Sequence, residues 1–148
     1  MEIAILALGC FWGPEIKFSK LNGVIKTEVG YCGGNSSNTN YKEVCTGKTN
    51  HAEVVKIEFD NSKISYEEIL NFFFEIHDPT ELNRQGPDVG TQYRSEIFYL
   101  SSRQKKIAEK VLEKFNEKKN GKIATKISNE INYCVAEEYH QKYLEKKF

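Results

Sequence analysis

A cysteine with aromatic neighbours, Cys10 in the stretch ALGCFWGPE (residues 7–15), is the first residue of this sequence that could do chemistry. The thiol follows a short apolar run and precedes Pro14 and Glu15, which are favoured in the first turn of a helix. We therefore expect Cys10 at or near a helix N-terminus, where the positive end of the helix dipole would lower the pKa of the thiol. The alternative is that Cys10 is a small buried hydrophobic residue, as most free cysteines are.

A carboxylate, Glu53, is predicted to face the interior of the fold. The stretch HAEVVKIEF (51–59) alternates between apolar and polar residues, as a half-buried strand does. The apolar face of this strand also carries Glu53 and, further back, His51. A buried carboxyl group without a cationic partner has a raised pKa and can donate a proton near neutral pH. The alternative is an inward Glu53 that is paired with an arginine or a lysine.

The three histidines are relevant to the possibility that the protein is a cysteine hydrolase, because such an enzyme needs a histidine base beside its nucleophilic thiol. His51 and His140 are the candidates for that base. His77 ends a predicted helix, where a capping role is the simpler interpretation. His140 lies in AEEYHQKYL (136–144), whose tyrosines mark an inward face, so it is either a core histidine or a site residue.

Aromatic side chains narrow the class of substrate. Phe11 and Trp12 could wall an apolar slot beside the thiol, and the hydroxyls of Tyr41 and Tyr93 can donate hydrogen bonds without ionising. A methyl sulfoxide fits these residues. A thiolate attacks its sulfur, its oxygen must be protonated, and its methyl group suits an aromatic slot.

The elements that position these residues follow from hydrophobic periodicity and from turn residues. Ser65 and Glu68 form a capping-box pair at the start of one helix. Strands and helices alternate without a strict βαβ rhythm, so we expect a two-layer α/β sandwich. The expected strands are 3–8, 24–29, 51–59, 95–100 and 122–128. The expected helices are 11–21, 65–77, 102–117 and 136–146.

Two segments, 31–50 and 78–94, are expected to be long loops. Loops of this length in a compact domain are usually functional or disordered. Their aromatic and acidic residues favour a functional role.

The overall composition bounds the number of domains and the kinds of partner. With 148 residues, we expect a single catalytic domain over residues 1–148. The 21 basic and 21 acidic residues give a net charge of zero, which argues against nucleic acid or an anionic membrane surface as a partner. The lysine-rich stretches 103–122 and 142–147 are interspersed with glutamates and indicate solvated helix faces.

The N-terminus and the cysteines indicate the compartment. The apolar run of residues 3–8 is too short to span a membrane and has no preceding basic residue, so it is a poor signal peptide. The four cysteines are widely spaced and contain no CxxC pair, which predicts free thiols in a reducing cytosol and no zinc site. We therefore expect a cytoplasmic protein.

Five stretches of the sequence are similar to one family. They occur in that family's order and cover nearly the whole chain, which resembles peptide methionine sulfoxide reductase A. The resemblance implies the same fold, an α/β (α+β) two-layer sandwich with helices packed on a mixed β-sheet around a ferredoxin-like core. The stretches are GCFWGPE (9–15), GYCGG (30–34), NYKEVCTGKTNHAEVV (40–55), HDPTELNRQGPDVGTQYRS (77–95) and AEEYHQKYL (136–144).

The resemblance also implies an activity, which is reduction of the S epimer of methionine sulfoxide, free or in peptides and proteins. No metal or organic cofactor is implied, and each sulfoxide epimer has its own reductase. Cys10 would be the nucleophile that becomes a sulfenic acid, and Glu53 would protonate the sulfoxide oxygen. The other implied roles are oxygen-holding hydroxyls for Tyr41 and Tyr93, a methyl pocket for Phe11 and Trp12, and substrate-binding positions for Asp88 and His140.

The step that clears the sulfenic acid is where the sequence departs from the family. Many members carry recycling cysteines in a tail beyond the YHQKYL match, whereas this sequence has no cysteine after Cys134. Cys134 and Cys32 are therefore the candidate resolving cysteines, while Cys45 occupies a position that is not the usual resolving one. We favour an external thiol reductant, glutathione or a glutaredoxin-type protein. A thioredoxin-type protein becomes the natural partner if an internal disulfide forms.

Two other hypotheses remain beside the reductase. A cysteine hydrolase would use Cys10 with His51 or His140 and would need no reductant. A ligand-binding module would keep the pocket but would carry an unreactive Cys10.

Overall fold

A six-stranded sheet forms the centre of the computed structural model, which describes residues 1–147. The strand order is β7-β6-β1-β3-β2-β8, and all neighbours are antiparallel except the parallel pair β6 and β7. The sheet is therefore mixed, as predicted. Its strands are β1 (Glu2–Leu8), β2 (Val24–Cys32), β3 (Ala52–Phe59), β6 (Ser95–Tyr99), β7 (Lys126–Asn129) and β8 (Cys134–Val135).

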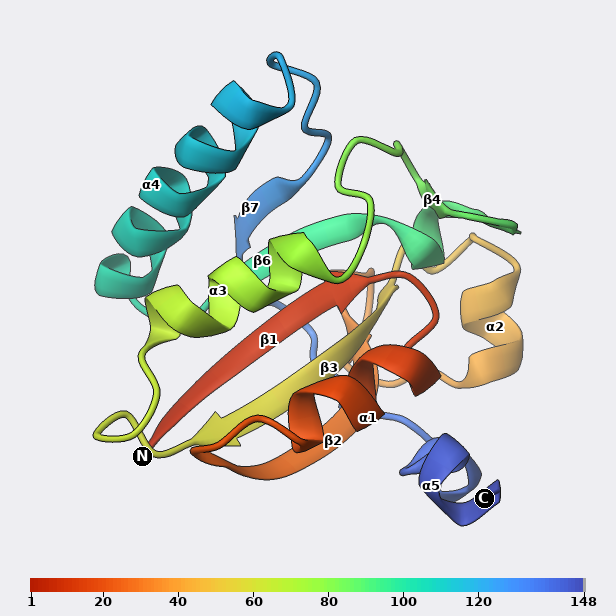
Figure 1. Cartoon of the computed structure of the whole chain (residues 1–148). Coiled ribbons are helices and arrows are strands. Elements are labelled where there is room, and N and C mark those ends of the chain that lie inside the picture. The colour runs from red at the N-terminus through yellow and green to blue at the C-terminus, as the bar shows by residue number, and fades with distance from the viewer. Residues whose placement is uncertain (148) are drawn as a thin grey trace.

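The helices form a second layer on one face of this sheet. Figure 1 shows α1 and α3 in front of the strands, with α4 beside α3 at the upper left. The succession β1-α1-β2-β3-α3-β6 with the strand order β6-β1-β3-β2 is that of a ferredoxin-like core. The expected two-layer α+β sandwich is confirmed. The helices of this layer are α1 (Trp12–Ser19), α3 (Tyr66–Glu75) and α4 (Ser102–Lys118).

Apolar clusters cover both faces of the sheet, because alternate side chains of each strand point to opposite sides. The larger cluster joins β3 to the three helices, and its members include Val55, Ile57, Phe59, Phe18, Phe73 and Val111. The smaller cluster lies on the other face and comprises Ile5, Ala7, Cys32, Ala52, Val54 and Phe98.

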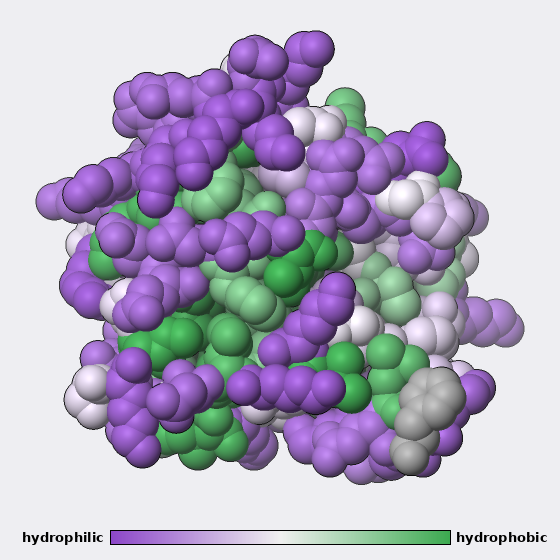
Figure 2. All heavy atoms as spheres, in the orientation of Figure 1, coloured by the Kyte–Doolittle hydropathy of each residue, from purple (hydrophilic) through white to green (hydrophobic). Residues whose placement is uncertain are grey.

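The helix starts follow the capping residues that the sequence offers. The Ser65 hydroxyl accepts a hydrogen bond from the Glu68 N–H at 3.0 Å, and the Glu68 carboxylate accepts one from the Ser65 N–H at 3.1 Å. The predicted capping box is confirmed. Ser101 caps α4 in the same way, through the N–H of Gln104. The solvent-facing side of α4 is hydrophilic (Figure 2), as its lysine-rich sequence predicts.

The two segments expected to be long loops contain short stretches of regular structure. Strand β2 continues past residue 29, because Tyr31 and Cys32 pair with β3. Asn40 then caps a short helix, α2 (Tyr41–Cys45). In the second segment, β4 (Arg84–Gln85) and β5 (Asp88–Val89) form a small hairpin, and η1 (Thr91–Tyr93) is a 3₁₀ turn.

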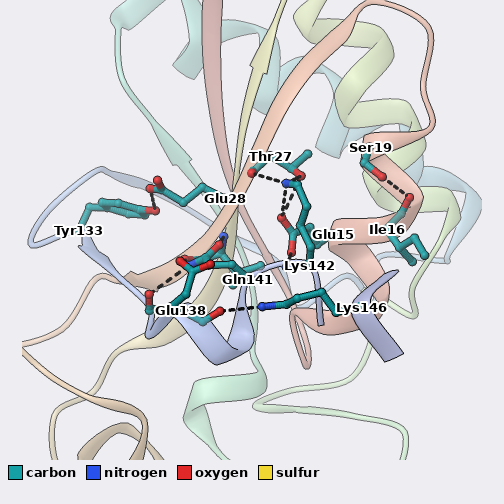
Figure 3. A network of polar contacts seen from close by, with 12 residues as sticks. Glu15, Ile16, Ser19, Thr27, Glu28, Tyr133, Glu138, Gln141, Lys142 and Lys146 are labelled. Carbon is teal, nitrogen blue, oxygen red and sulfur yellow. Dashed lines mark hydrogen bonds and ion pairs between the residues drawn. The ribbon is translucent and has the colours of Figure 1, made fainter. Parts of the chain in front are cut away.

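The single helix expected over 136–146 is wrong. The chain forms β8, a 3₁₀ turn η2 (Glu138–His140) and a separate helix α5 (Tyr143–Lys147). The Gln141 side-chain amide bonds to both the N–H and the carbonyl of Val29, as a neighbouring strand would. Lys142 then has a φ of 51°, and its N–H donates to Glu15 at 2.7 Å (Figure 3). These tertiary contacts outweigh the helical periodicity of the segment.

Among residues 1–147, no helix is both long enough and apolar enough to cross a membrane.

Replacement of Ser65 by alanine tests the capping box. Ser65→Ala is expected to lower the free energy of unfolding by about 1 kcal/mol, because the Glu68 N–H loses its acceptor. Urea unfolding would measure the change, with Ser102→Ala, an exposed serine in the first turn of α4, as the control. Equal stability of the two variants would contradict the role given to Ser65.

Candidate functional site

Cys10 lies in the tight turn between β1 and α1. Gly9 has a φ of +98°, and a Cβ at this position would lie 2.8 Å from the Cβ of Gln85, so only glycine fits before the thiol. Phe11 is the N-cap of α1, so Cys10 lies directly before the helix. The side chain is half-buried and carries a free thiol.

The expectation that the helix lowers the pKa of Cys10 is wrong. The pKa of the thiol is raised to about 11, mainly by burial and to a smaller extent by the nearby charges of Glu53 and Asp88. The backbone N–H of Trp12 acts in the opposite direction but is outweighed. Removal of the thiolate from water therefore dominates over the short helix α1, and Cys10 is a neutral thiol at pH 7 in the free protein.

Glu53 lies in β3 and points into the same region. Its side chain is buried, and its Oε1 accepts a hydrogen bond from the N–H of Phe11 at 3.2 Å, next to the thiol. Its Oε2 has no hydrogen-bond partner among residues 1–147. Burial raises the pKa of Glu53 to about 8, so the carboxyl group is mostly protonated at pH 7.

The alternative of a cation paired with Glu53 is not supported. None of the four ion pairs among the described residues involves Glu53. The buried arginine, Arg94, pairs with Glu96 at 2.6 Å instead. Glu53 is therefore available as a proton donor.

Two tyrosine hydroxyls lie near the carboxyl group. Burial raises the pKa of Tyr93 to about 12 and also raises the pKa of Tyr41, and the charge of Glu53 adds to both shifts. The charges of Cys45 and Cys10 also raise the pKa of Tyr93. Both hydroxyls remain protonated near neutral pH and can donate hydrogen bonds to an oxygen in this region.

His140 is surrounded by the predicted aromatic wall. Its ring lies 5.2 Å from that of Phe11, 5.7 Å from that of Trp12 and 4.4 Å from that of Tyr41. The indole N–H of Trp12 donates to His140 Nδ1 at 3.1 Å, so Nδ1 is an acceptor and the proton is on Nε2. Burial lowers the pKa of His140, and Nε2 is buried without a partner within residues 1–147.

The histidines do not form the pair that a cysteine hydrolase needs. His77 Nδ1 bonds to the Phe73 carbonyl at 2.6 Å, and this confirms the capping role. His51 Nε2 bonds to the Ser36 carbonyl at 2.8 Å. Since His140 is hydrogen-bonded to Trp12, each of the three histidines has a hydrogen-bond partner other than Cys10.

The candidate resolving cysteines lie in β2 and β8. Cys32 follows Tyr31 in β2 and points into the smaller apolar cluster, on the opposite face of the sheet from Phe11. Burial raises the pKa of Cys32 to about 12. Cys134 is half-buried, with Sγ 3.7 Å from the Thr39 carbonyl.

Two residues that were not predicted from the sequence also lie at this site. Cys45 lies at the end of α2, four positions after Tyr41, and its charge contributes to the raised pKa of Cys10. Glu137 accepts a hydrogen bond from the N–H of Tyr41. The signal for Cys45 was the Asn40 cap, which marks a helix and places Tyr41 and Cys45 on one face. Glu137 had no local signal, because its partners are far away in the sequence.

Among residues 1–147, no group of three or more histidine, cysteine, aspartate or glutamate side chains is arranged to hold a metal ion.

Comparisons with known proteins agree on one family. The family profile described as peptide methionine sulfoxide reductase matches residues 2–148. The chain is 74% identical to the peptide methionine sulfoxide reductase MsrA of Pelagibacter ubique (strain HTCC1062), over 99% of this chain and 100% of that protein.

Solved structures from Saccharomyces cerevisiae share the fold. Mxr1 in reduced form has a TM-score of 0.94 at 43% identity, with 98% of this chain and 84% of that one covered. Mxr1 in complex with Trx2 has a TM-score of 0.69 at 29% identity, with 96% and 84% covered.

Alkylation of Cys10 tests its ionisation. At pH 7 the thiol is expected to react with iodoacetamide roughly 10²-fold more slowly than free cysteine, because its pKa of about 11 leaves less thiolate. Peptide mass spectrometry resolves the rate for each cysteine as a function of pH. Above about pH 8, where Glu53 is ionised, Glu53→Gln is expected to speed the reaction by removing a nearby negative charge. If the alkylation rate of Cys10 reached half its maximum at a pH below the pKa of free cysteine, the effect of the helix dipole would exceed that of burial.

Proposed function

We propose that this chain, which belongs to the peptide methionine sulfoxide reductase family, acts on the S epimer of methionine sulfoxide through direct attack by Cys10. Its membership of the family makes it an oxidoreductase that reduces methionine sulfoxide. The observation that carries this proposal is the buried carboxyl group of Glu53, which forms no ion pair within residues 1–147 and accepts a hydrogen bond from the residue that follows the thiol. One catalytic domain, residues 1–148, performs the reaction.

The proposed reaction moves one oxygen and returns one proton. The sulfur of Cys10 attacks the sulfoxide sulfur while Glu53 donates its proton to the sulfoxide oxygen. The Glu53 carboxylate then accepts the proton of the Cys10 thiol. The protonated oxygen is then transferred to the sulfur of Cys10. A Cys10 S–O bond forms while the substrate S–O bond and the bond between the two sulfurs break, so that methionine is released and Cys10 is left as a sulfenic acid. A proton on both groups at pH 7 is the state that this exchange requires.

The surroundings of the thiol account for the choice of epimer. Tyr41 and Tyr93 donate hydrogen bonds to the sulfoxide oxygen, and Phe11 and Trp12 enclose the methyl group. The thiol approaches the sulfur from a third direction. The mirror-image sulfoxide would exchange its methyl group and its oxygen, leaving the oxygen among aromatic rings without a donor, which is unfavourable. Asp88 and His140 line the part of the site that receives the rest of the methionine.

The sulfenic acid is cleared by an external thiol. That thiol attacks the sulfur of Cys10, the oxygen leaves as water, and a mixed disulfide forms. The placement of Cys32 on the opposite face of the sheet supports an external source. The yeast relative in complex with Trx2 supports a thioredoxin-type protein, and glutathione or a glutaredoxin-type protein offers the same chemistry.

The compartment proposed is the cytoplasm. All four cysteines are free thiols, which is typical of a reducing environment.

Single turnover without a reductant tests the reaction. The S epimer of a methionine sulfoxide peptide is expected to yield about one methionine per enzyme, as expected for one reactive thiol, while the R epimer yields none. Cys10→Ser is expected to abolish the product, whereas Cys134→Ser, which removes a half-buried thiol in β8, is expected to keep it and serves as the control for thiol removal.

The number of thiols left after this turnover identifies the resolving step. Loss of one thiol is expected if the sulfenic acid waits for an external reductant. Loss of two would overturn the external assignment and would show an internal disulfide. No methionine from either epimer would refute the proposed reaction.

The pH dependence tests Glu53 as the acid. Because the proton donor is the protonated form and its pKa is about 8, kcat/KM is expected to fall as pH rises above about 8. Glu53→Gln is expected to lower the rate by roughly 10²–10⁴-fold and to remove this decline. Glu58→Gln, on the same strand, should keep both the rate and the profile. A Glu53→Gln enzyme with the wild-type alkaline decline would assign that titration to another group.

A further inference from the structure

Glu137 joins two distant parts of the chain through its carboxylate. It lies between β8 and η2, and both of its oxygens accept hydrogen bonds. Oε1 accepts from the Tyr31 hydroxyl at 2.8 Å, and Oε2 accepts from the backbone N–H of Tyr41 at 2.9 Å. Burial acts to raise the pKa of Glu137, but the hydrogen bonds from Tyr41 and Tyr31 help to outweigh burial, and the net shift is downward. The carboxylate is therefore ionised, and both bonds are charge-assisted.

The bond to Tyr41 falls where helix α2 lacks a partner of its own. Tyr41 is the first residue of this helix, and N–H groups in the first turn have no carbonyl to bond within the helix. The Asn40 cap satisfies the N–H of Glu43 and remains within the same segment. Val44 is the buried residue of α2 that reaches the core. Glu137 is thus the polar tie between the start of α2 and the sheet.

The segment that carries Glu137, residues 137–140, also contacts the ring of Tyr41. His140 follows Glu137 by three residues, and its ring lies 4.4 Å from that of Tyr41. His140 is held by Trp12, and Tyr31, the second partner of Glu137, lies with its ring 5.8 Å from that of Phe11. The backbone and the ring of Tyr41 are therefore both placed by a segment that is anchored to the aromatic wall of the site.

We propose that Glu137 is a positioning residue for sulfoxide reduction, which aims the Tyr41 hydroxyl at the sulfoxide oxygen by fixing the start of α2. This inference rests on the proposed function, in which the Tyr41 hydroxyl holds that oxygen. Glu137 acts through Tyr41 and does not touch the substrate. Because a small displacement of an aligned donor weakens its hydrogen bond in the transition state, loss of the tie reduces the rate more than the binding of substrate.

A double-mutant cycle tests the proposal in steady-state assays with the S epimer of a methionine sulfoxide peptide and dithiothreitol as the reductant. Glu137→Gln keeps the size of the side chain but removes the charge, and its NH₂ group cannot accept a hydrogen bond. It is expected to lower kcat about tenfold, with KM changed by less than about twofold. In the Tyr41→Phe background, the same substitution is expected to lower kcat by no more than about twofold, because the hydroxyl that it aims is already absent.

Matched variants distinguish an effect of Glu137 on catalysis from an effect on the stability of the fold. Glu138→Gln changes the adjacent, exposed glutamate and is expected to leave kcat at the wild-type value. Tyr31→Phe removes the other partner of the carboxylate, so it provides a second variant if Glu137→Gln does not fold. It is expected to lower kcat by a smaller factor, again only when Tyr41 is present. Thermal unfolding of each variant confirms that the folded protein is being compared.

The outcomes distinguish this proposal from the proposed function. A wild-type kcat in Glu137→Gln, or equal fold-losses with and without the Tyr41 hydroxyl, would overturn the positioning role and leave the reaction intact. A wild-type kcat in Tyr41→Phe would overturn the oxygen-holding role of that hydroxyl, and the role of Glu137 with it. Loss of methionine production in the wild-type protein would refute the reaction itself.

Discussion

The hydrogen bond from the Phe11 N–H to the Glu53 carboxyl group is the contact on which the site depends. It joins the turn after β1 to the neighbouring strand β3 and places a proton donor beside the residue that follows Cys10. No cation compensates the buried carboxyl group among the described ion pairs. Because this carboxyl group is buried, its ionisation is disfavoured.

The same burial acts on both partners of the proposed reaction. Cys10 and Glu53 each have a raised pKa, so each holds its proton at pH 7. For a simple nucleophile this would be a disadvantage, because the thiolate is the reactive form. For a sulfoxide it is useful, since the oxygen must gain a proton as the sulfur is attacked. The protonated pair therefore suits an oxygen-transfer reaction better than an acyl transfer, which requires a base.

The C-terminal segment completes the site from outside the sheet. Gln141 supplies the hydrogen bonds that a further strand would give to Val29, and Lys142 is fixed through Glu15. With these anchors in place, Glu137 and His140 lie against Tyr41. The segment thus contributes little regular structure, but it determines how the aromatic and hydroxyl groups of the site are arranged.

Local signals along the chain were sufficient to predict several elements of the fold. Alternation along 51–59 predicted β3 and the inward Glu53, the Ser65 capping box predicted α3, and the turn after β1 placed Cys10 before a helix. Features that depend on distant partners could not be predicted in this way. Burial reversed the expected pKa shift of Cys10, because desolvation by packed neighbours exceeds the effect of a short helix. The path of the last segment was likewise set by contacts with residues more than 100 positions away, which local periodicity does not encode.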